Sequence, residues 1–172
     1  RRCLKRSEVA ERVGAVNTFW VVEGDFYGDN TDVGGFARTV RDLVDGRSVA
    51  RIALLGAGGA AAAVCVAAEA LRAREVRIFA RSEERAGRLA ERFPRLAWPH
   101  SSLEDALEDC DLVVNATPLG LRDDDPLPAP IEAIPKGAVA FDLVYRPRET
   151  PWVCAAREAG RTAADGLAML LE

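Results

Sequence analysis

A short apolar run that ends in a glycine-rich turn and continues into an alanine-rich stretch constrains the fold of this chain most. The segment IALLGAGGAAAAV places Gly56, Gly58 and Ala61 at the spacing G-x-G-x-x-A. The first glycine permits a tight turn, the second lets backbone amides approach a pyrophosphate, and the small third residue lets a helix pack closely on the strand. We therefore predict a dinucleotide-binding turn with the pyrophosphate at the helix N-terminus, and a turn that serves packing alone is the alternative. The predicted contacts are Gly56, Ala57, Gly58, Gly59 and Ala60.

The pattern after Ala50 alternates short apolar runs with stretches of helical periodicity, among them EVRIFA, SEERAGRLAERF, DLVVNAT and GAVAFDLVY. Strands and helices in alternation indicate an α/β protein with a parallel sheet and crossover helices. We predict a Rossmann-type doubly wound parallel sheet over residues 49–165 and the start of a C-terminal helix over 166–172. The proline-rich segment 119–135 is expected to leave the sheet as a mobile loop.

The first 48 residues follow a different pattern. A charged, helix-like start precedes two apolar runs in AVNTFWVVEGDFYGDN, and the segment Glu23-Gly24-Asp25 between them is typical of a hairpin. A helical pattern that stops at Gly46 follows. We predict that residues 1–48 form the end of another domain together with a connecting helix.

Composition limits the classes of partner. The chain has 172 residues, and its 23 basic and 27 acidic side chains give a net charge of −4 without a basic cluster, so no nucleic-acid partner is expected. Its apolar runs are shorter than the roughly 18 residues of a membrane span, so no membrane partner is expected. We expect a small-molecule substrate and a cytoplasmic location, and a homodimer stays open.

Cysteine and histidine are too sparse and too widely spaced for a zinc site or a C-x-x-C pair, so no metal is expected. Buried free thiols are favoured over disulfides, as in a reducing compartment. His100 lies at a helix entrance in WPHSSLED, where a solvated or capping role is favoured. Ser101 and Glu104 are expected to form the capping box of that helix. The cysteines are Cys3, Cys65, Cys110 and Cys154.

The end of the second strand of the predicted Rossmann sheet, EVRIFA, bears on the choice of dinucleotide. An NAD site requires an acidic residue there for the ribose hydroxyls, whereas RIFARSEER offers Arg81, Ser82 and Arg85. A guanidinium group matches the geometry of a phosphate, so these residues favour NADP as the cofactor. An ordinary solvated arginine at a strand end is the alternative.

A second polar segment, YGDNTDVGGF, places Asp29, Asn30, Thr31 and Asp32 in succession. Taken alone, these residue types favour a turn, because Asn and Asp hydrogen-bond to their own backbone.

Six segments in order, GAVNT, GDNTD, LGAGGAA, NATPLG, DLVYRPRET and DGLAML, resemble the shikimate dehydrogenase family of shikimate and quinate dehydrogenases. The resemblance runs from Gly14 to the C-terminus. It implies an NADP-dependent, reversible reduction of 3-dehydroshikimate to shikimate, a step toward chorismate and the aromatic amino acids. It also implies a substrate cleft between an α/β substrate-binding domain and the Rossmann domain.

The resemblance assigns roles to individual residues. Asp32 matches one half of a catalytic Lys-Asp pair, which agrees with the need for proton transfer when a hydride reaches a ketone carbon. Arg81 matches the family pattern at the strand end, whereas Ala80 stands where the family has asparagine. Plain core packing stays an alternative for Leu143 and Met169. The implied substrate contacts are Asn17, Thr31, Asp32 and Tyr145, and the implied cofactor contacts further along the chain are Ala80, Asn115, Thr117, Leu143, Gly166 and Met169.

The chain also departs from the family pattern. It carries neither the family's N-terminal serine motif nor its catalytic lysine, and no glutamine follows DGLAML before Glu172. Lys5 lacks the P-x-K context of that lysine and is not assigned its role. The sequence also begins without methionine, so we expect a fragment with an incomplete active site.

Other functions stay open at this stage. One is a quinate or shikimate dehydrogenase that uses NAD, and another is a nucleotide-binding fragment without activity of its own. A methylenetetrahydrofolate dehydrogenase or an S-adenosylmethionine methyltransferase could share the glycine turn, but neither explains GDNTD and DLVYRP together.

Overall fold

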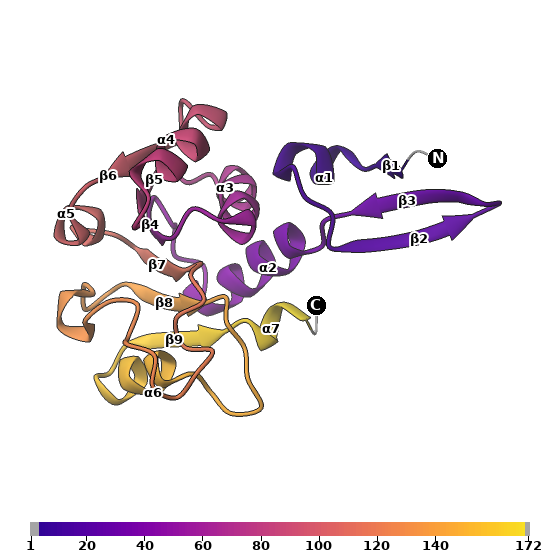
Figure 1. The fold of residues 1–172 in the computed structure, drawn as a ribbon. Coiled ribbons are helices and arrows are strands. Elements are labelled where there is room, and N and C mark those ends of the chain that lie inside the picture. The colour runs from indigo at the N-terminus through magenta and orange to yellow at the C-terminus, as the bar shows by residue number, and fades with distance from the viewer. Residues whose placement is uncertain (1–3, 171–172) are drawn as a thin grey trace.

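The computed structural model describes residues 4–170, which form two separate sheets (Figure 1). The larger sheet has six parallel strands in the order β6-β5-β4-β7-β8-β9. The chain reverses its direction of winding between β4 and β7, as in doubly wound nucleotide-binding sheets, and this confirms the predicted fold class. The strands are β4 (Arg51–Leu55), β5 (Glu75–Phe79), β6 (Ala97–His100), β7 (Leu112–Asn115), β8 (Val139–Asp142) and β9 (Thr162–Asp165).

Helices cover both faces of the six-stranded sheet, because its inner strands are apolar on both sides. Alternate residues of a strand point to opposite faces, so Ile52 and Leu54 join one buried cluster while Ala53 and Leu55 join the other. The first cluster is covered by α2 (Asp32–Val44), α3 (Gly59–Ala70) and α4 (Glu83–Arg92). The second is covered by α5 (Leu103–Leu107), the short 3₁₀ helix η1 (Ile131–Ala133) and α6 (Pro151–Glu158).

The smaller sheet has the strand order β1-β3-β2 and extends away from the larger one (Figure 1). Its elements are β1 (Leu4–Arg6), α1 (Glu8–Val13), β2 (Thr18–Val22) and β3 (Asp25–Asp29). The hairpin of β2 and β3 is confirmed, and its turn residues Glu23 and Gly24 have φ values of 50° and 88°. The helix-like interpretation of the chain start is wrong for residues 4–6, which form a strand parallel to β3. Pairing with a strand that follows later in the chain overrides the local helical pattern.

The connecting helix α2 leads from the smaller sheet to the larger one (Figure 1). The C-terminal helix α7 (Leu167–Leu170) begins within the predicted segment, directly after β9, and lies against α2. A Cβ added to Gly35 would lie 2.7 Å from the carbonyl oxygen of Met169, so glycine is required for this approach. This contact places the first turn of α2 at the carboxyl edge of the six-stranded sheet.

The predicted capping box is displaced by one residue. Ser102, not Ser101, is the N-cap of α5, and its Oγ accepts a hydrogen bond from the backbone N of Asp105 over 3.2 Å. Ser102 Oγ also donates to Glu104 over 2.9 Å, so the two side chains bond to each other, two positions apart. His100 is the last residue of β6 and does not cap the helix.

The cysteines of the described region are free thiols, as predicted. Burial raises the pKa of both Cys65 and Cys110 to about 12, whereas Cys154 is only half-buried. Cys3 lies outside the described residues. Between residues 4 and 170, no helix has the length and apolar character needed to cross a membrane.

Segment 119–135 leaves the sheet as predicted, but its second half is packed rather than open. Ala129, Ile131 and Ile134 are buried in the second cluster beneath α6. Trp152 Nε1 donates to the carbonyl oxygen of Ala129 over 3.1 Å, which fastens this segment to α6.

Candidate functional site

The glycine-rich turn lies at the carboxyl edge of the sheet, where the winding direction reverses between β4 and β7. Gly56 follows β4, has a φ of 108°, and donates from its backbone N to the carbonyl oxygen of Phe79 over 2.8 Å. A Cβ at this position would lie 2.8 Å from the carbonyl oxygen of Ala116 in the loop after β7. Gly56 is therefore required twice, once by its backbone conformation and once by the close approach of the neighbouring loop.

The next residues of the turn form an open helix N-terminus. Gly58 is the N-cap of α3, no side chain caps the helix, and its first turn carries no acidic residue. A Cβ added to Gly58 or Gly59 meets nothing within 4 Å, whereas Ala61 is fully buried against the sheet. Backbone amides and the helix dipole at such a terminus favour an anion. The glycine at 58 is therefore not required by packing within the described residues.

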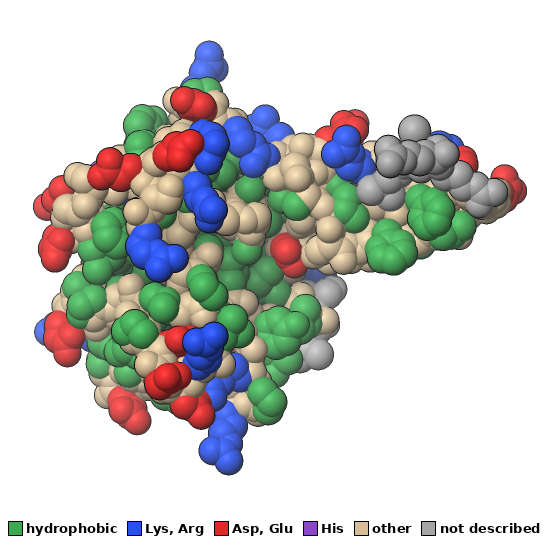
Figure 2. Space-filling view, in the orientation of Figure 1, with side chains coloured by type: hydrophobic (Ala, Val, Ile, Leu, Met, Phe, Trp, Pro, Cys, Tyr) green, Lys and Arg blue, Asp and Glu red, His purple; other side chains and the backbone are tan. Residues whose placement is uncertain are grey.

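A hollow of about 360 Å³ lies in front of this helix N-terminus. Its lining comes from both parts of the chain, with Gly14 and Ala15 on one side and Gly58 and Gly59 on the other. Arg85, a predicted cofactor residue, contributes from α4, and basic side chains gather over α4 in Figure 2. The hollow therefore combines an open helix terminus with positive charge.

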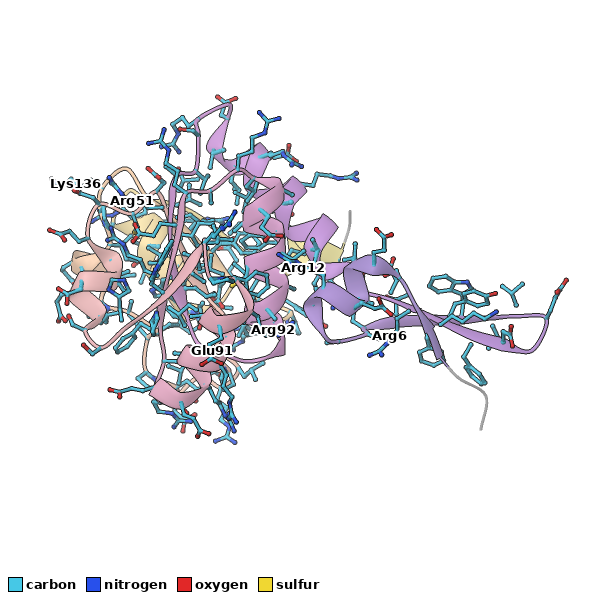
Figure 3. All side chains as sticks on the ribbon, turned by 90° about the horizontal axis from the view of Figure 1, so that it is seen from above. Arg6, Arg12, Arg51, Glu91, Arg92 and Lys136 are labelled. Carbon is cyan, nitrogen blue, oxygen red and sulfur yellow. The ribbon has the colours of Figure 1, made fainter. Side chains whose placement is uncertain are left out.

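Two further arginines of this hollow, Arg88 and Arg92, were not found from the sequence, although their spacing from Arg85 places all three on one side of α4. Arg88 pairs with Glu84 over 3.2 Å. Arg92 donates two hydrogen bonds of 2.8 Å to the carbonyl oxygens of Arg12 and Val13 (Figure 3). Arg92 thus ties α4 to the end of α1.

The three predicted cofactor residues at the end of β5, residues 80–82, differ in exposure and in hydrogen bonding. Arg81 is exposed, as a phosphate contact requires, and Ala80 is half-buried without a polar side chain. Ser82 is the N-cap of α4, and its Oγ accepts from the backbone N of Arg85 over 3.3 Å. Its hydroxyl hydrogen can still be donated to a ligand.

The polar segment after β3 does not form an isolated turn, because it leads directly into α2. Thr31 is the N-cap of this helix and Asp32 its first residue. Asn17 Nδ2 donates to Thr31 Oγ1 over 3.2 Å and to Asp32 Oδ1 over 2.8 Å, while the backbone N of Thr31 donates to Asn17 Oδ1 over 3.0 Å. The structure thus brings together three of the predicted substrate residues, and Thr18 Oγ1 lies 3.4 Å from Thr31 Oγ1.

Neither lysine of the chain is bonded to Asp32. Lys5 Nζ binds Asp25 over 2.6 Å and Tyr27 over 3.3 Å, and the hydrogen bond to Asp25 raises its pKa. Lys136 lies at the end of the larger sheet that is remote from the smaller sheet (Figure 3). This arrangement agrees with leaving Lys5 without a catalytic assignment.

The loops after β7, β8 and β9 hold the remaining predicted cofactor residues. Asn115 is fully buried, and its Oδ1 accepts hydrogen bonds from the backbone N and from Oγ1 of Thr117 over 3.0 and 2.6 Å. Gly166 lies close to the loop after β8, and a Cβ at this position would clash with the carbonyl oxygen of Leu143. Leu143 and Met169 are half-buried at the margin of the first core cluster, which keeps the packing alternative open for both.

Tyr145, a predicted substrate residue, does not pack against the first core cluster as Leu143 and Met169 do. Its side chain is 52% exposed and lies beyond the buried end of β8. Exposure leaves the phenol free to meet a ligand, but the structure does not bring Tyr145 into the hydrogen-bonded group around Asp32.

Asp142 is a buried polar residue that the sequence analysis did not single out. It ends β8, has no exposed surface, and accepts hydrogen bonds from Asn115, Val144 and Thr150. Burial raises its pKa above the ordinary range, and these three hydrogen bonds oppose that rise. A carboxylate directly before a loop predicted to bind cofactor was the signal available in DLVYRP.

Comparison with known proteins assigns the family. A model of the shikimate / quinate 5-dehydrogenase family matches residues 38–119. A shikimate dehydrogenase (NADP(+)) from Mesorhizobium japonicum is 39% identical over 170 residues, which are 97% of this chain and 61% of that protein. This chain thus spans about three fifths of the length of that relative.

Two solved structures have the same fold. Shikimate 5-dehydrogenase from Thermus thermophilus, in complex with NADP(H) and shikimate, has a TM-score of 0.83 at 37% identity and covers 98% of this chain and 62% of its own. Quinate dehydrogenase from Corynebacterium glutamicum, in complex with NAD, has a TM-score of 0.84 at 30% identity, with 97% and 62% covered. The chain belongs to the shikimate / quinate 5-dehydrogenase family.

Proposed function

We propose that this chain forms the NADP-binding domain and one wall of the substrate site of a dehydrogenase that interconverts 3-dehydroshikimate and shikimate. One observation carries the proposal: the glycine turn and the Asn17–Thr31–Asp32 group lie at the same edge of the larger sheet. Gly14 and Ala15 line the hollow in front of Gly58, and the contact of Gly35 with Met169 holds the start of α2 beside α7. A dinucleotide on the turn would therefore extend toward Asp32.

The cofactor in this proposal is NADP rather than NAD. The exposed Arg81 at the end of β5 and Arg85 at the hollow supply positive charge where an NAD site has a carboxylate. The Mesorhizobium and Thermus proteins are named with NADP, which supports this choice. NAD use remains the alternative, because the structurally similar quinate dehydrogenase was solved with NAD.

The proposed chemistry assigns Asp32 to proton handling. The nicotinamide supplies or accepts the hydride, while the substrate oxygen gains or loses a proton. Asn17 holds Oδ1 of Asp32 through the 2.8 Å hydrogen bond and leaves Oδ2 for the substrate or a neighbouring cation. Thr31 and Asn17 add the further polar groups that a polyhydroxylated ring requires.

The cationic partner of Asp32 is proposed to be a lysine outside these 172 residues. Both lysines present lie elsewhere, since Lys5 is bound to Asp25 and Lys136 lies at the end of the larger sheet that is remote from the smaller sheet. The chain as it stands would then bind NADP with little turnover of shikimate. Activity would return when the coding sequence upstream of Arg1 and downstream of Glu172 is included.

Nucleotide titration and activity assays together distinguish nucleotide binding from dehydrogenase activity. Isothermal titration of the chain with NADP and NAD should show saturable binding of NADP and weaker binding of NAD. Oxidation of shikimate and of quinate by the extended protein, followed through NADPH formation, then tests the substrate. A chain that binds neither nucleotide would overturn the proposal, and an extended protein that binds NADP but oxidises neither acid would leave only the nucleotide-binding function.

Location and association belong to the same proposal. The free thiols of Cys65 and Cys110 support a reducing, cytoplasmic location. The apolar strand β2 supports association of two copies, because Phe19 is 70% exposed and Val21 52% exposed on an edge strand. Analytical ultracentrifugation of the chain, with a Phe19→Lys variant as comparison, tests that association.

A further inference from the structure

The carboxylate of Asp142 lies at the junction of the loops that follow β7 and β8. Its side chain has no exposed surface. Oδ1 accepts from Asn115 Nδ2 over 2.8 Å and from the backbone N of Val144 over 3.0 Å, and Oδ2 accepts from Thr150 Oγ1 over 2.8 Å. All three groups bonded to this carboxylate are hydrogen-bond donors. The two carboxylate oxygens, which accept these bonds, therefore hold the two loops together.

The bond to Asn115 extends this network through the loop after β7. Asn115 Nδ2 also donates to the carbonyl oxygen of Leu119 over 3.0 Å. Asn115 Oδ1 accepts from the backbone N and the hydroxyl of Thr117, whose Oγ1 in turn accepts from the backbone N of Leu119 over 3.2 Å. The orientation of the Asn115 amide therefore sets the position of Thr117, which lies directly beside Gly56 of the glycine turn.

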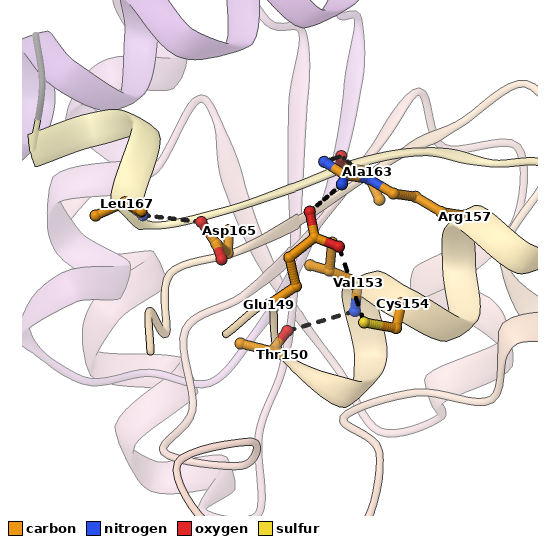
Figure 4. A network of polar contacts seen from close by, with 8 residues as sticks. All are labelled: Glu149, Thr150, Val153, Cys154, Arg157, Ala163, Asp165 and Leu167. Atoms are coloured by element: carbon orange, nitrogen blue, oxygen red, sulfur yellow. Dashed lines mark hydrogen bonds and ion pairs between the residues drawn. The ribbon is translucent and has the colours of Figure 1, made fainter. Parts of the chain in front are cut away.

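The bonds to Val144 and Thr150 do the same for the loop after β8. Thr150 is the N-cap of α6, where its Oγ accepts from the backbone N of Val153 over 3.4 Å (Figure 4). The carbonyl oxygen of Val144 accepts from the backbone N of Gly166 over 3.2 Å. This loop is thus fastened at Val144 and at Thr150, with Leu143 directly before the first of these residues and Tyr145 directly after it.

We propose that Asp142 is a positioning residue, which holds Thr117 and Leu143 in the arrangement that receives the nicotinamide end of the dinucleotide. This inference rests on the proposed NADP binding. It follows from the geometry, because one buried carboxylate joins the loop after β7, which borders the reversal point of the sheet, to the loop after β8. The adenine end is held elsewhere, by the end of β5 and by α4, so it does not depend on Asp142.

Asp142→Asn is the direct test, because the amide keeps the shape but turns one acceptor oxygen into a donor that faces other donors. Asp111→Asn is the matched control. Asp111 Oδ2 also joins strands, as it accepts from the backbone N of Ala50 and Arg51 over 2.8 Å each, but at the opposite edge of the sheet. Thr150→Val and Thr150→Ser form a milder pair, which removes or keeps one donor to the carboxylate.

The readout compares NADP with adenosine 2′,5′-bisphosphate, which has the adenine end alone. Asp142→Asn should weaken NADP binding by about fivefold or more and change bisphosphate binding by less than about twofold, since only the contacts near the nicotinamide are displaced. Thr150→Val should give a smaller shift in the same direction, while Thr150→Ser and Asp111→Asn should give none. Equal weakening of both ligands, or of neither, by Asp142→Asn would overturn the inference.

Hydrogen exchange supplies a readout without a ligand. In Asp142→Asn, backbone amides of residues 116–120 and 143–149 should exchange faster, while those of β4 and β5 keep their protection. Unchanged exchange in these loops would overturn the positioning role even if NADP binds. Failure of the proposed function is distinguishable, because the wild-type chain would then bind neither NADP nor the bisphosphate.

Discussion

Asn17 holds the carboxylate of Asp32 through a hydrogen bond of 2.8 Å from Nδ2 to Oδ1, although the two residues lie on opposite sides of the β2–β3 hairpin in sequence. The hairpin brings the residue before β2 next to the first residue of α2. The backbone N of Asn17 strengthens this arrangement by donating to the carbonyl oxygen of Asp29 over 3.1 Å. The carboxylate is therefore oriented before any substrate binds.

Asp32→Asn in the extended protein should lower the rate constant by roughly 10²-fold or more, because a neutral amide can neither accept a proton nor stabilise a neighbouring ammonium. Affinity for NADP should hardly change, since the glycine turn and Arg81 are untouched. Single-turnover rates and NADP titrations measure the two effects. Asp42→Asn on the exposed side of α2 is the control and should keep full activity. Full activity of Asp32→Asn would show that Asp32 has no catalytic role and serves only as the first residue of α2.

Arg81→Ala should remove most of the preference for NADP over NAD. The wild-type chain should favour NADP by about 1.5 to 3 kcal/mol if the 2′-phosphate forms charge-assisted hydrogen bonds with this guanidinium. Titration of both nucleotides against both proteins measures the difference, with the exposed Arg95→Ala as a charge-matched control. Equal affinities for the two nucleotides in the wild type would contradict the prediction.

Gly58→Val should lose nucleotide binding, whereas Gly56→Ala should lose stability. A side chain at 58 has free space and an ordinary φ of −93°, so Gly58→Val should stay folded and lose nucleotide binding, because the side chain enters the pyrophosphate position. Thermal unfolding and NADP titration, done together on the same protein, test this. Retained affinity would show that this glycine has no role in binding.

Gly56→Ala should instead lower the free energy of unfolding by about 1 to 4 kcal/mol, because alanine is strained at a φ of 108° and would contact the carbonyl oxygen of Ala116. Gly87→Ala is the control, since a Cβ in this part of α4 meets nothing within 4 Å and alanine favours a helix. Urea denaturation of both variants measures the change. Similar stabilities of the two variants would argue against the close approach of the two loops.

The buried thiols of Cys65 and Cys110 should react slowly with iodoacetamide at neutral pH, whereas the half-buried Cys154 should react faster. Burial raises the pKa of Cys65 from 9.0 to about 12. The folded state thus favours the neutral thiol, so its contribution to stability is complete below pH 9.0 and is lost as the pH rises toward about 12. Cys65→Ala should therefore lose less stability than the wild type over this range in urea denaturation. An identical pH dependence would contradict the assignment.

The sequence by itself determined the larger sheet and its glycine turn. The alternation of apolar runs and helical stretches is a local pattern with a fixed period, and G-x-G-x-x-A encodes its own backbone geometry at Gly56. The β2–β3 hairpin was equally readable, because Glu23 and Gly24 form a turn between adjacent strands. These features depend on residues close in sequence, so their signals survive without knowledge of the fold.

Only the tertiary structure decided which side chains are bonded to one another. Asn17 meets Asp32, Arg92 reaches the end of α1, and Asp142 joins two loops through contacts between residues up to 80 positions apart. The strand at residues 4–6 likewise exists only because β3 pairs with it. No local pattern encodes such distances, since they result from how the strands order themselves in the two sheets and how the helices pack across them.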